Sequence, residues 1–223
     1  MLEEFKDLII EALFPRKCVG CGKEGTYICK DCSLFLSETP NLFSAGNLEE
    51  LVSIWEYEGL VKNLIYCIKY KGAFDIINEL IERAFEIREP KIVLSRTKHK
   101  PESEPEPEDI IITFVPMFKK KKKRRGFNQA ELIAKKVAEK TNKEVVALLE
   151  KIKDTPSQTR LTKNERLENV KGSFKRIREA DCYDNVLLVD DVWTSGATMQ
   201  ECSKVLKKSG VKKVFGFTLA RTP

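Results

Sequence analysis

Apolar residues recur along this chain at two spacings, which together predict an α/β protein. Several segments place apolar residues three or four positions apart, as a helix with one buried face does; these are 60–70, 75–88, 128–140 and 199–208. Short apolar runs predict strands at 51–57, 110–115, 145–149, 186–189 and 213–219. The nearly continuous run at 110–115 is typical of a strand covered on both faces. Strands that alternate with helices indicate a mostly parallel sheet flanked by helices.

Two segments stand outside this alternation. Residues 1–14 place charged residues among apolar ones, which predicts a short amphipathic helix ended by Pro15. This segment lacks the features of a signal peptide, and the chain has no long apolar run, so we expect a cytoplasmic protein with no membrane span. Residues 95–109 contain three prolines, five acids and the one histidine, His99, and predict a solvated loop.

Four of the seven cysteines form a doubled motif, Cys18-x-x-Cys21 and Cys29-x-x-Cys32. Two such turns bring four thiolates to one point, which is the tetrahedral ligand set that zinc prefers and which leaves no position open for water. In a reducing compartment, metal ligation explains the motif better than disulfides or free thiols. We therefore expect structural zinc in an N-terminal module of residues 1–45, followed by an α/β domain of residues 46–223. The 223 residues are enough for both.

Other residues near these cysteines and farther along the chain have structural interpretations. Gly20 and Gly22 flank Cys21 and suit the positive φ that such turns often need. The three remaining cysteines lie in apolar patterns, which places them in the core; they are Cys67, Cys182 and Cys202.

The segment 186–198 carries the most chemistry. An apolar strand ends at two acids, Asp190 and Asp191, and a loop of small residues precedes the next helix; the loop is Thr194, Ser195, Gly196, Ala197 and Thr198. A helix N-terminus attracts an anion through its backbone N–H groups and dipole. Acids at a strand end can accept hydrogen bonds from sugar hydroxyls, at the sheet edge where ligands bind. The segment therefore predicts a sugar phosphate site. The alternative, acids that cap an ordinary helix, explains only one of the two.

This segment resembles the phosphoribosyl pyrophosphate (PRPP) signature of type I phosphoribosyltransferases, in which four apolar residues and two acids precede a phosphate loop. The chain as a whole resembles the ComF family, competence-associated phosphoribosyltransferase-like proteins with an N-terminal zinc module. The supporting motifs, in family order, are Phe14-Pro15, Arg125-Gly126-Phe127-Asn128-Gln129, Gln158 with Leu161, and Arg166 with Asn169. The resemblance spans nearly the whole chain and implies the type I phosphoribosyltransferase fold. Ser195 stands where threonine is usual, and 95–109 and the lysine run are longer and more charged than the family pattern.

The resemblance implies a role for each matching residue. Asp190 and Asp191 would hold the ribose hydroxyls, directly or through Mg²⁺, and the loop 194–198 would cradle the 5-phosphate of PRPP or another ribose 5-phosphate ligand. Arg125 and Asn128 would face the pyrophosphate. The polar segment 153–169 would be a flexible loop that closes over the site, with contacts from Thr155, Gln158 and Arg166.

The net charge of +6 is modest but unevenly placed, because residues 119–125 are seven consecutive basic residues. Three interpretations stay open. The run could neutralise the pyrophosphate of PRPP, bind a nucleic-acid backbone, or form a solvated loop that offsets the acidic loop 101–109. Arg125 fits the pyrophosphate role because guanidinium grips phosphate bidentately. The sequence shows no interleaving of basic and aromatic residues of the kind that stacks bases.

Three hypotheses about function follow. The first is an enzyme that binds Mg²⁺ and PRPP and transfers the phosphoribosyl group to an unidentified acceptor, by positioning and charge stabilisation. The second is a non-catalytic accessory protein of DNA uptake that binds single-stranded DNA, with a competence helicase or other uptake proteins as partners. The third, a structural scaffold, leaves the intact acid pair unexplained. The zinc module and segment 46–94 would form the hood that selects an acceptor, and they carry no motif for recognising a base.

Overall fold

A computed structural model describes residues 15–39, 43–87, 110–155, 163–177 and 183–222. Its main sheet has five strands in the order β1-β2-β7-β6-β3, and β4 and β5 form a separate two-stranded sheet. The strands are β1 (Phe43–Ala45), β2 (Leu48–Glu56), β3 (Ile110–Phe114), β4 (Leu149–Lys151), β5 (Phe174–Arg176), β6 (Asn185–Trp193) and β7 (Lys213–Arg221). The helices are α2 (Lys30–Ser33), α3 (Gly59–Lys71), α4 (Asp75–Ile87), α6 (Lys119–Arg125), α7 (Gln129–Thr141), α8 (Lys163–Val170) and α9 (Ala197–Lys208).

The main sheet is parallel over four strands, as the sequence predicts. The strands β2, β7, β6 and β3 run in one direction, and only β1 pairs antiparallel, in a hairpin with β2. Successive residues of the central strand β6 face opposite sides of the sheet. Leu187 and Val189 therefore join one hydrophobic cluster, and Val186 and Leu188 join the other.

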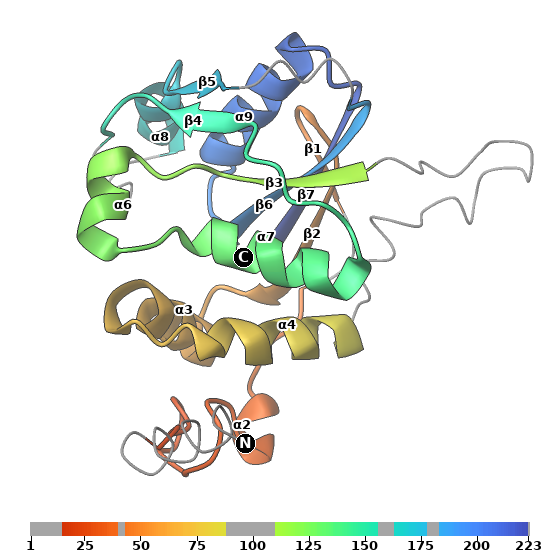
Figure 1. The fold of residues 1–223 in the computed structure, drawn as a ribbon. Coiled ribbons are helices and arrows are strands. Elements are labelled where there is room, and N and C mark those ends of the chain that lie inside the picture. Colours follow the sequence, from red (N-terminus) through yellow and green to blue (C-terminus); the bar gives the residue numbers. More distant parts are fainter. Residues whose placement is uncertain (1–14, 40–42, 88–109, 156–162, 178–182, 223) are drawn as a thin grey trace, which may run out of the picture.

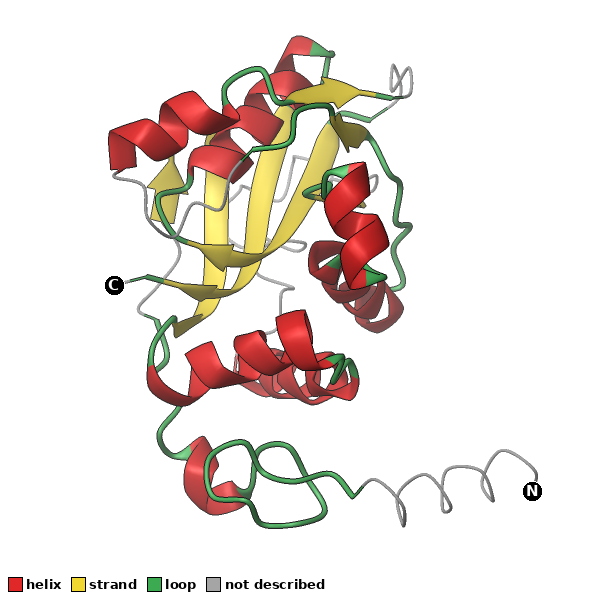
Figure 2. Ribbon diagram, turned by 90° about the vertical axis from the view of Figure 1, so that its left-hand side faces the viewer, coloured by secondary structure: helices red, strands yellow, loops and turns green. Residues whose placement is uncertain are grey.

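Helices cover both faces of this sheet (Figures 1 and 2). The helices α3, α4 and α7 pack on one face around Trp55 and Phe217, which are fully buried. The helix α9 and the β4–β5 sheet pack on the other face, where Met199 and Cys202 are buried. The buried positions of Cys67 and Cys202 confirm the sequence prediction for these two cysteines, while Cys182 lies outside the described residues.

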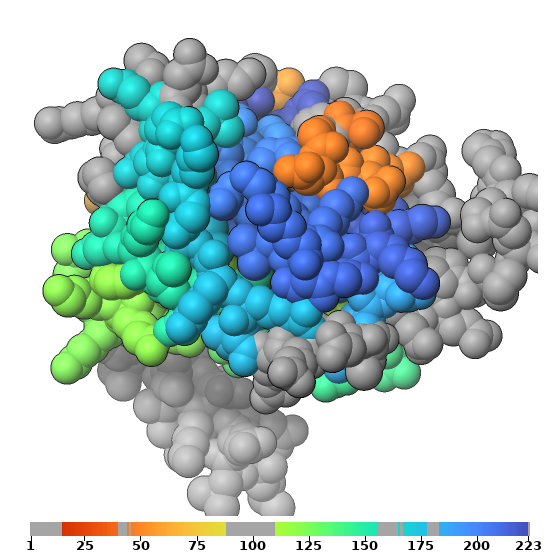
Figure 3. Space-filling model, turned by 90° about the horizontal axis from the view of Figure 1, so that it is seen from above, coloured from red at the N-terminus to blue at the C-terminus, as the bar shows by residue number. Residues whose placement is uncertain are grey.

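The helix α9 also holds the turn between β1 and β2. The Gln200 carboxamide accepts a hydrogen bond from the Asn47 N–H (2.7 Å), and the Ser203 hydroxyl donates to the Asn47 carbonyl (2.9 Å). Figure 3 shows this turn, in orange, against the blue C-terminal part of the chain. The hairpin at the start of the sheet is thereby fixed by an element some 150 residues later in the sequence.

Two sequence predictions about individual elements are wrong. The predicted strand 145–149 makes only a single parallel bridge, between Val145 and Ile112, because the Leu148 N–H turns to the Thr113 hydroxyl and the chain leaves the sheet. Its last residue begins β4, which pairs antiparallel with β5. The basic run, which one interpretation took as a loop, is the helix α6. Lysine and arginine have good helix propensity, and Gly126 ends the helix in the left-handed conformation.

The Cys module, residues 15–39, lies below α4 in Figure 1. The Glu79 carboxylate of α4 accepts hydrogen bonds from the Thr26 hydroxyl and from two backbone N–H groups, those of Tyr27 and Ile28, at 2.8 to 3.0 Å. The Arg83 guanidinium donates to the Ile28 carbonyl at 2.7 Å. The Ile28 side chain is fully buried in the cluster of Trp55. The module is therefore packed against the α/β domain.

The predicted N-terminal helix (1–14) and the predicted loop 95–109, with His99, lie outside the described residues. Within the ranges that the structure describes, no helix has both the length and the apolar character needed to cross a bilayer.

Candidate functional site

The carboxyl ends of the parallel strands meet at one edge of the sheet, and a pocket of about 550 Å³ lies there. Residues that directly follow three strands contribute to it: Tyr57 after β2, Thr194 after β6 and Thr222 after β7. We call this the edge pocket. Its remaining lining residues are Lys62, Lys69, Asp190, Asp191, Val192, Trp193, Gly196, Ala197, Thr198 and Met199. The acid pair and most of the predicted phosphate loop therefore share one cavity.

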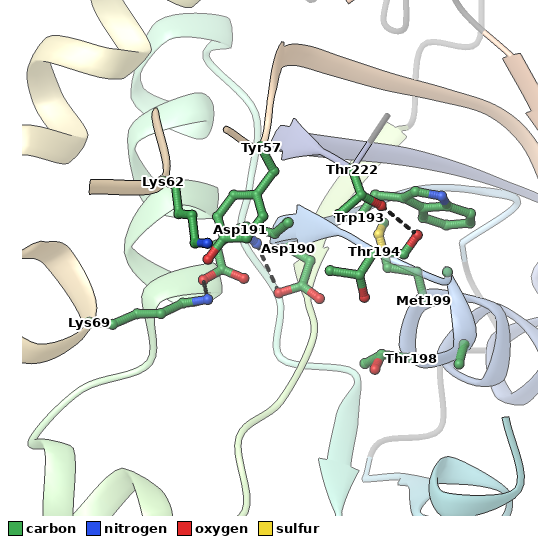
Figure 4. A pocket seen from close by; sticks show the side chains of 13 residues that line it. Tyr57, Lys62, Lys69, Asp190, Asp191, Trp193, Thr194, Thr198, Met199 and Thr222 are labelled. Atoms are coloured by element: carbon green, nitrogen blue, oxygen red, sulfur yellow. Dashed lines mark hydrogen bonds and ion pairs between the residues drawn. The ribbon is translucent and has the colours of Figure 1, made fainter. Parts of the chain in front are cut away.

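The acid pair lies inside a strand rather than after it. The strand β6 continues to Trp193, because β7 is equally long and pairs with it up to Arg221. The Asp190 carboxylate accepts the Asp191 N–H at 2.9 Å. The Asp191 carboxylate forms an ion pair with Lys69 at 2.5 Å, and the Gln129 carboxamide lies 3.5 Å from the same oxygen. Figure 4 shows Lys69 and Lys62 approaching the acids from one side and the threonine loop from the other.

The two acids have different surroundings. Burial, together with the negative charge of Asp191, raises the pKa of the Asp190 carboxyl to about 8. Burial alone would lower the pKa of the Lys69 ammonium, but the charge of Asp191 and its hydrogen bond raise it above its usual value. Asp190 therefore holds its proton more tightly than an ordinary carboxyl does, whereas Asp191 is paired with the Lys69 ammonium. A protonated carboxyl can donate one hydrogen bond as well as accept.

The loop after the acids leads into the N-terminus of α9. Gly196 is the N-cap and has a left-handed backbone, with φ at 76°. A Cβ at this position would lie 2.2 Å from the Trp193 ring, so only glycine fits beneath that ring. The Ser195 hydroxyl lies 3.5 Å from the Ala197 N–H, and the Thr222 hydroxyl donates to the Thr194 carbonyl at 3.2 Å. The first turn of a helix of this length can accept an anion at the pocket wall.

A smaller pocket of about 130 Å³ adjoins the first and shares Asp190 with it. It lies between the carboxyl ends of β3 and β6. After β3 the chain goes on to α7 on one face of the sheet, and after β6 it goes on to α9 on the opposite face. We call it the switch pocket. Two lysines line it, Lys121 and Lys151. Burial and the neighbouring Lys121 lower the pKa of Lys151.

The predicted pyrophosphate contacts have other neighbours in this structure. Asn128 lines the switch pocket, but its side chain caps α7 by accepting the Ala130 N–H (3.2 Å) and donates to the Val115 carbonyl (2.9 Å). The Arg125 guanidinium lies 5.3 Å above the Tyr70 ring and lines neither pocket.

The predicted flexible-loop residues are only partly described. Thr155 is buried, and its hydroxyl and carbonyl bind the ammonium groups of Lys151 and Lys121 at 2.8 and 2.6 Å. Arg166 belongs to α8, but its side chain is not described. Gln158 lies outside the described residues.

The sequence analysis missed Lys69, Tyr57 and Thr222. Lys69 is one of many lysines on α3 and its surroundings, and its spacing matches the polar face of an ordinary amphipathic helix. Tyr57 and Thr222 do carry a usable signal, because each follows a strand that ends at the same edge as β6. Reading every strand end, and not only the one with two acids, would have found both.

The four cysteines of the doubled motif come together, with their Sγ atoms all within 4.8 Å of one another. The Sγ atoms of Cys21 and Cys29 are 3.6 Å apart, close to the edge of about 3.8 Å expected for a tetrahedron with Zn–S bonds of about 2.3 Å. Although burial raises the pKa of the Cys18 thiol, backbone N–H groups, that of Cys29 first, lower it to about 6. The thiol cluster can therefore hold a metal ion such as zinc.

Gly20 and Gly22 serve this cluster differently. Gly22 has the expected positive φ of 79°, whereas Gly20 does not. A Cβ on Gly20 would lie 2.7 Å from the Cys32 sulfur, so this glycine provides space for a ligand and not an unusual turn.

Comparison with known proteins found no matching family model, but several relatives cover nearly the whole chain. Competence protein F of Haemophilus influenzae is 30% identical over 208 residues, which is 92% of this chain and 84% of that protein. Competence protein ComFC of Bacillus subtilis is 26% identical over 92% of this chain and 78% of its own length. DNA utilization protein YhgH of Escherichia coli K12 is 24% identical over 92% of this chain and 84% of its own length. With this extent of similarity, and with the cysteine cluster and α/β sheet that the resemblance implied, the chain belongs to the ComF family.

Proposed function

We propose that this protein is an accessory component of DNA uptake or utilization that binds single-stranded DNA, and that its edge pocket binds a ribose 5-phosphate group. The observation that carries the first part is the set of relatives named for competence and DNA utilization, each matched along about 92% of this chain. Uptake proteins, a competence helicase among them, are the partners that this role implies.

The charge of α6 supports the proposal. Of its seven basic residues, Lys119, Lys121 and Lys122 pair with acids of the same molecule, at 2.8 to 3.8 Å. No acid in the described ranges pairs with Lys120, Lys123 or Arg124, which are exposed. Three solvated cations on one short helix can contact successive phosphates.

Binding of a fluorescent oligothymidine at increasing salt tests this proposal. We expect the Lys120→Gln/Lys123→Gln variant to bind more weakly and to have a shallower dependence of log K on log salt, by about 1.4 for two lost phosphate contacts. The control is Lys208→Gln/Lys213→Gln, which removes the same charge from exposed positions on α9 and β7. No binding of the oligonucleotide by the folded wild-type protein at low salt would reject a role in DNA binding.

The edge pocket supports the second part of the proposal. Phosphate would bind at the N-terminus of α9, and the Asp190 and Asp191 carboxyls would hold the ribose hydroxyls. Since Lys69 already pairs with Asp191, Mg²⁺ would enter together with the oxygens of a ligand such as PRPP. Calorimetric titration with Mg·PRPP and with ribose 5-phosphate, on the wild type and on Asp190→Ala/Asp191→Ala, tests the pocket. Loss of micromolar binding in the variant is the expected result.

Transfer of the phosphoribosyl group is a second candidate function, favoured by the position of the switch pocket. The bond from ribose C1 to pyrophosphate would break as the acceptor bonds to C1, and Lys121 and Lys151 would neutralise the departing pyrophosphate. Both lysines line that pocket beside Asp190. Release of pyrophosphate from PRPP in the presence of nucleobases or amines, and its loss in Lys151→Gln, would test the reaction.

For the Cys module we propose bound structural zinc. The four thiolates would close its coordination sphere, so the metal would stabilise the module and take no part in catalysis.

A further inference from the structure

Two tyrosines on α3 are exposed side by side. The side chains of Tyr66 and Tyr70, one helical turn apart, are 53% and 65% exposed, although both rings are large. Their ring centroids are 4.9 Å apart, with the ring planes inclined by 43°. The opposite face of α3 carries Leu64, Ile65 and Ile68, which are buried in the cluster that also includes residues of α4 and β2. The helix is therefore fixed by its core, and its tyrosines face solvent.

The end of the basic helix α6 reaches these tyrosines. The Arg125 guanidinium lies 5.3 Å above the Tyr70 ring, within the range of a cation–π contact. A second contact lies beside it, where the rings of Phe74 and Phe127 meet edge to face at 4.4 Å. Figure 1 shows α6 and α3 on the same side of the molecule. The fold thus joins the aromatic residues at 66–74 to the cations at 119–125, which lie far apart in the sequence.

We infer that this surface, formed by Tyr66, Tyr70 and Arg125 with the exposed cations of α6, binds single-stranded DNA by stacking its bases and pairing with its phosphates. The inference rests on the proposed function and gives it a location. Exposed rings offer flat faces to unpaired bases, whereas Lys120, Lys123 and Arg124 offer charges to the backbone. The sequence alone shows no interleaving of basic and aromatic residues; the fold supplies it.

This combination favours an unpaired strand over a duplex. The bases of a duplex stack on one another and leave no face for Tyr66 or Tyr70, so a duplex would engage only the cations. Neither tyrosine lines the edge pocket, although Lys62 and Lys69 of the same helix do. The surface and the edge pocket are therefore lined by different side chains of α3.

The test is fluorescence anisotropy with a labelled oligothymidine at fixed salt, using the full chain. We expect Tyr66→Ala/Tyr70→Ala to weaken binding at least about 10-fold, with the salt dependence unchanged. Tyr66→Phe/Tyr70→Phe, which keeps both rings, should bind within about twofold of the wild type. The control is Leu34→Ala/Phe35→Ala, which removes two apolar side chains of comparable exposure, 85% and 76%, from the Cys module. Unchanged circular dichroism would show that each variant is folded.

The outcomes separate this inference from the proposed function. If the wild type binds strongly and the tyrosine variant binds equally well, the proposed location on this surface is wrong, whereas the proposal of DNA binding stands. Absence of binding by the wild type at low salt would overturn both. Equal affinity for a duplex of the same length would overturn base stacking and leave a purely electrostatic contact.

Discussion

Lys69 and Asp191 form an ion pair across the candidate site, with the Lys69 Nζ atom 2.5 Å from the Asp191 Oδ2 atom. The two residues come from different elements, α3 and β6, and both side chains are largely shielded from water, at 21% and 13% exposure. An ammonium group thereby occupies a place beside the acid pair that a divalent cation would otherwise be expected to fill. Any ligand that brings Mg²⁺ to Asp191 has to compete with this lysine.

Removing that lysine should make ligand binding depend more strongly on metal. In Lys69→Gln the Asp191 carboxylate loses its partner, so we expect affinity for PRPP to fall in the absence of Mg²⁺ and to recover when Mg²⁺ is added. Calorimetric titration with and without Mg²⁺ measures the change. Lys62→Gln, in the same pocket, is the matched control, because no carboxylate in the described part of the chain pairs with Lys62. Equal dependence on Mg²⁺ in both variants would contradict the prediction.

The raised pKa of Asp190 predicts a pH-dependent stability. A carboxyl whose pKa rises from 3.8 to about 8 on folding stabilises the folded state fully below about pH 4, and this contribution is lost as the pH rises toward 8. Between pH 6 and 8 the wild type should therefore lose about 2 kcal/mol of unfolding free energy relative to Asp190→Asn, and the remaining loss above pH 8 should be below about 0.5 kcal/mol. Urea unfolding at several pH values measures this difference. The exposed Asp184→Asn variant should follow the wild type throughout.

Gly196 should tolerate no side chain. Gly196→Ala places a methyl group against the Trp193 ring and also forces alanine into a left-handed backbone. Gly210→Ala is the matched control, because Gly210 has a positive φ of 99° but no atom lies near its would-be Cβ. We expect Gly210→Ala to cost about 1 kcal/mol of unfolding free energy, and Gly196→Ala to cost more and to weaken binding of inorganic phosphate. Equal costs would mean that the Trp193 ring moves aside freely.

The cysteine cluster should bind one zinc ion per chain. Cys21→Ser should lower the zinc content, measured by a colorimetric chelator after unfolding, and should lower the midpoint of thermal unfolding. Cys67→Ser, at a buried cysteine outside the cluster, should keep the zinc. Because zinc binds thiolates, loading should also release protons, which titration in buffers of different ionisation enthalpy detects. Full zinc content in Cys21→Ser would rule out this ligand set.

The sequence alone predicted those features whose pattern lies within one continuous segment. The alternation of strands and helices, the four cysteines and the Asp190 loop are each local patterns, and the structure contains all three. Other features depend on which segments meet in space. These are the ion pair of Asp191, the position of the tyrosines beside Arg125, and the failure of residues 145–149 to form a strand of the main sheet. Lys69 looks like any lysine on an amphipathic helix until β6 is placed next to α3. Likewise, the edge strand β3 offers only five residues, and the Thr113 hydroxyl diverts the chain that would have paired with it.

The Glu79 carboxylate couples the stability of the Cys module to that of the α/β sheet. It accepts hydrogen bonds from three donors of the module, and the neighbouring Ile28 is fully buried in the same hydrophobic cluster as Trp55 and Phe217. Deleting residues 1–45 would consequently uncover part of the interior and remove three of the donors that Glu79 binds, leaving it the Arg83 guanidinium at 3.3 Å, so the shortened chain should be prone to aggregation. We therefore expect removal of the module to require compensating substitutions on α4, where Glu79 and Arg83 lie.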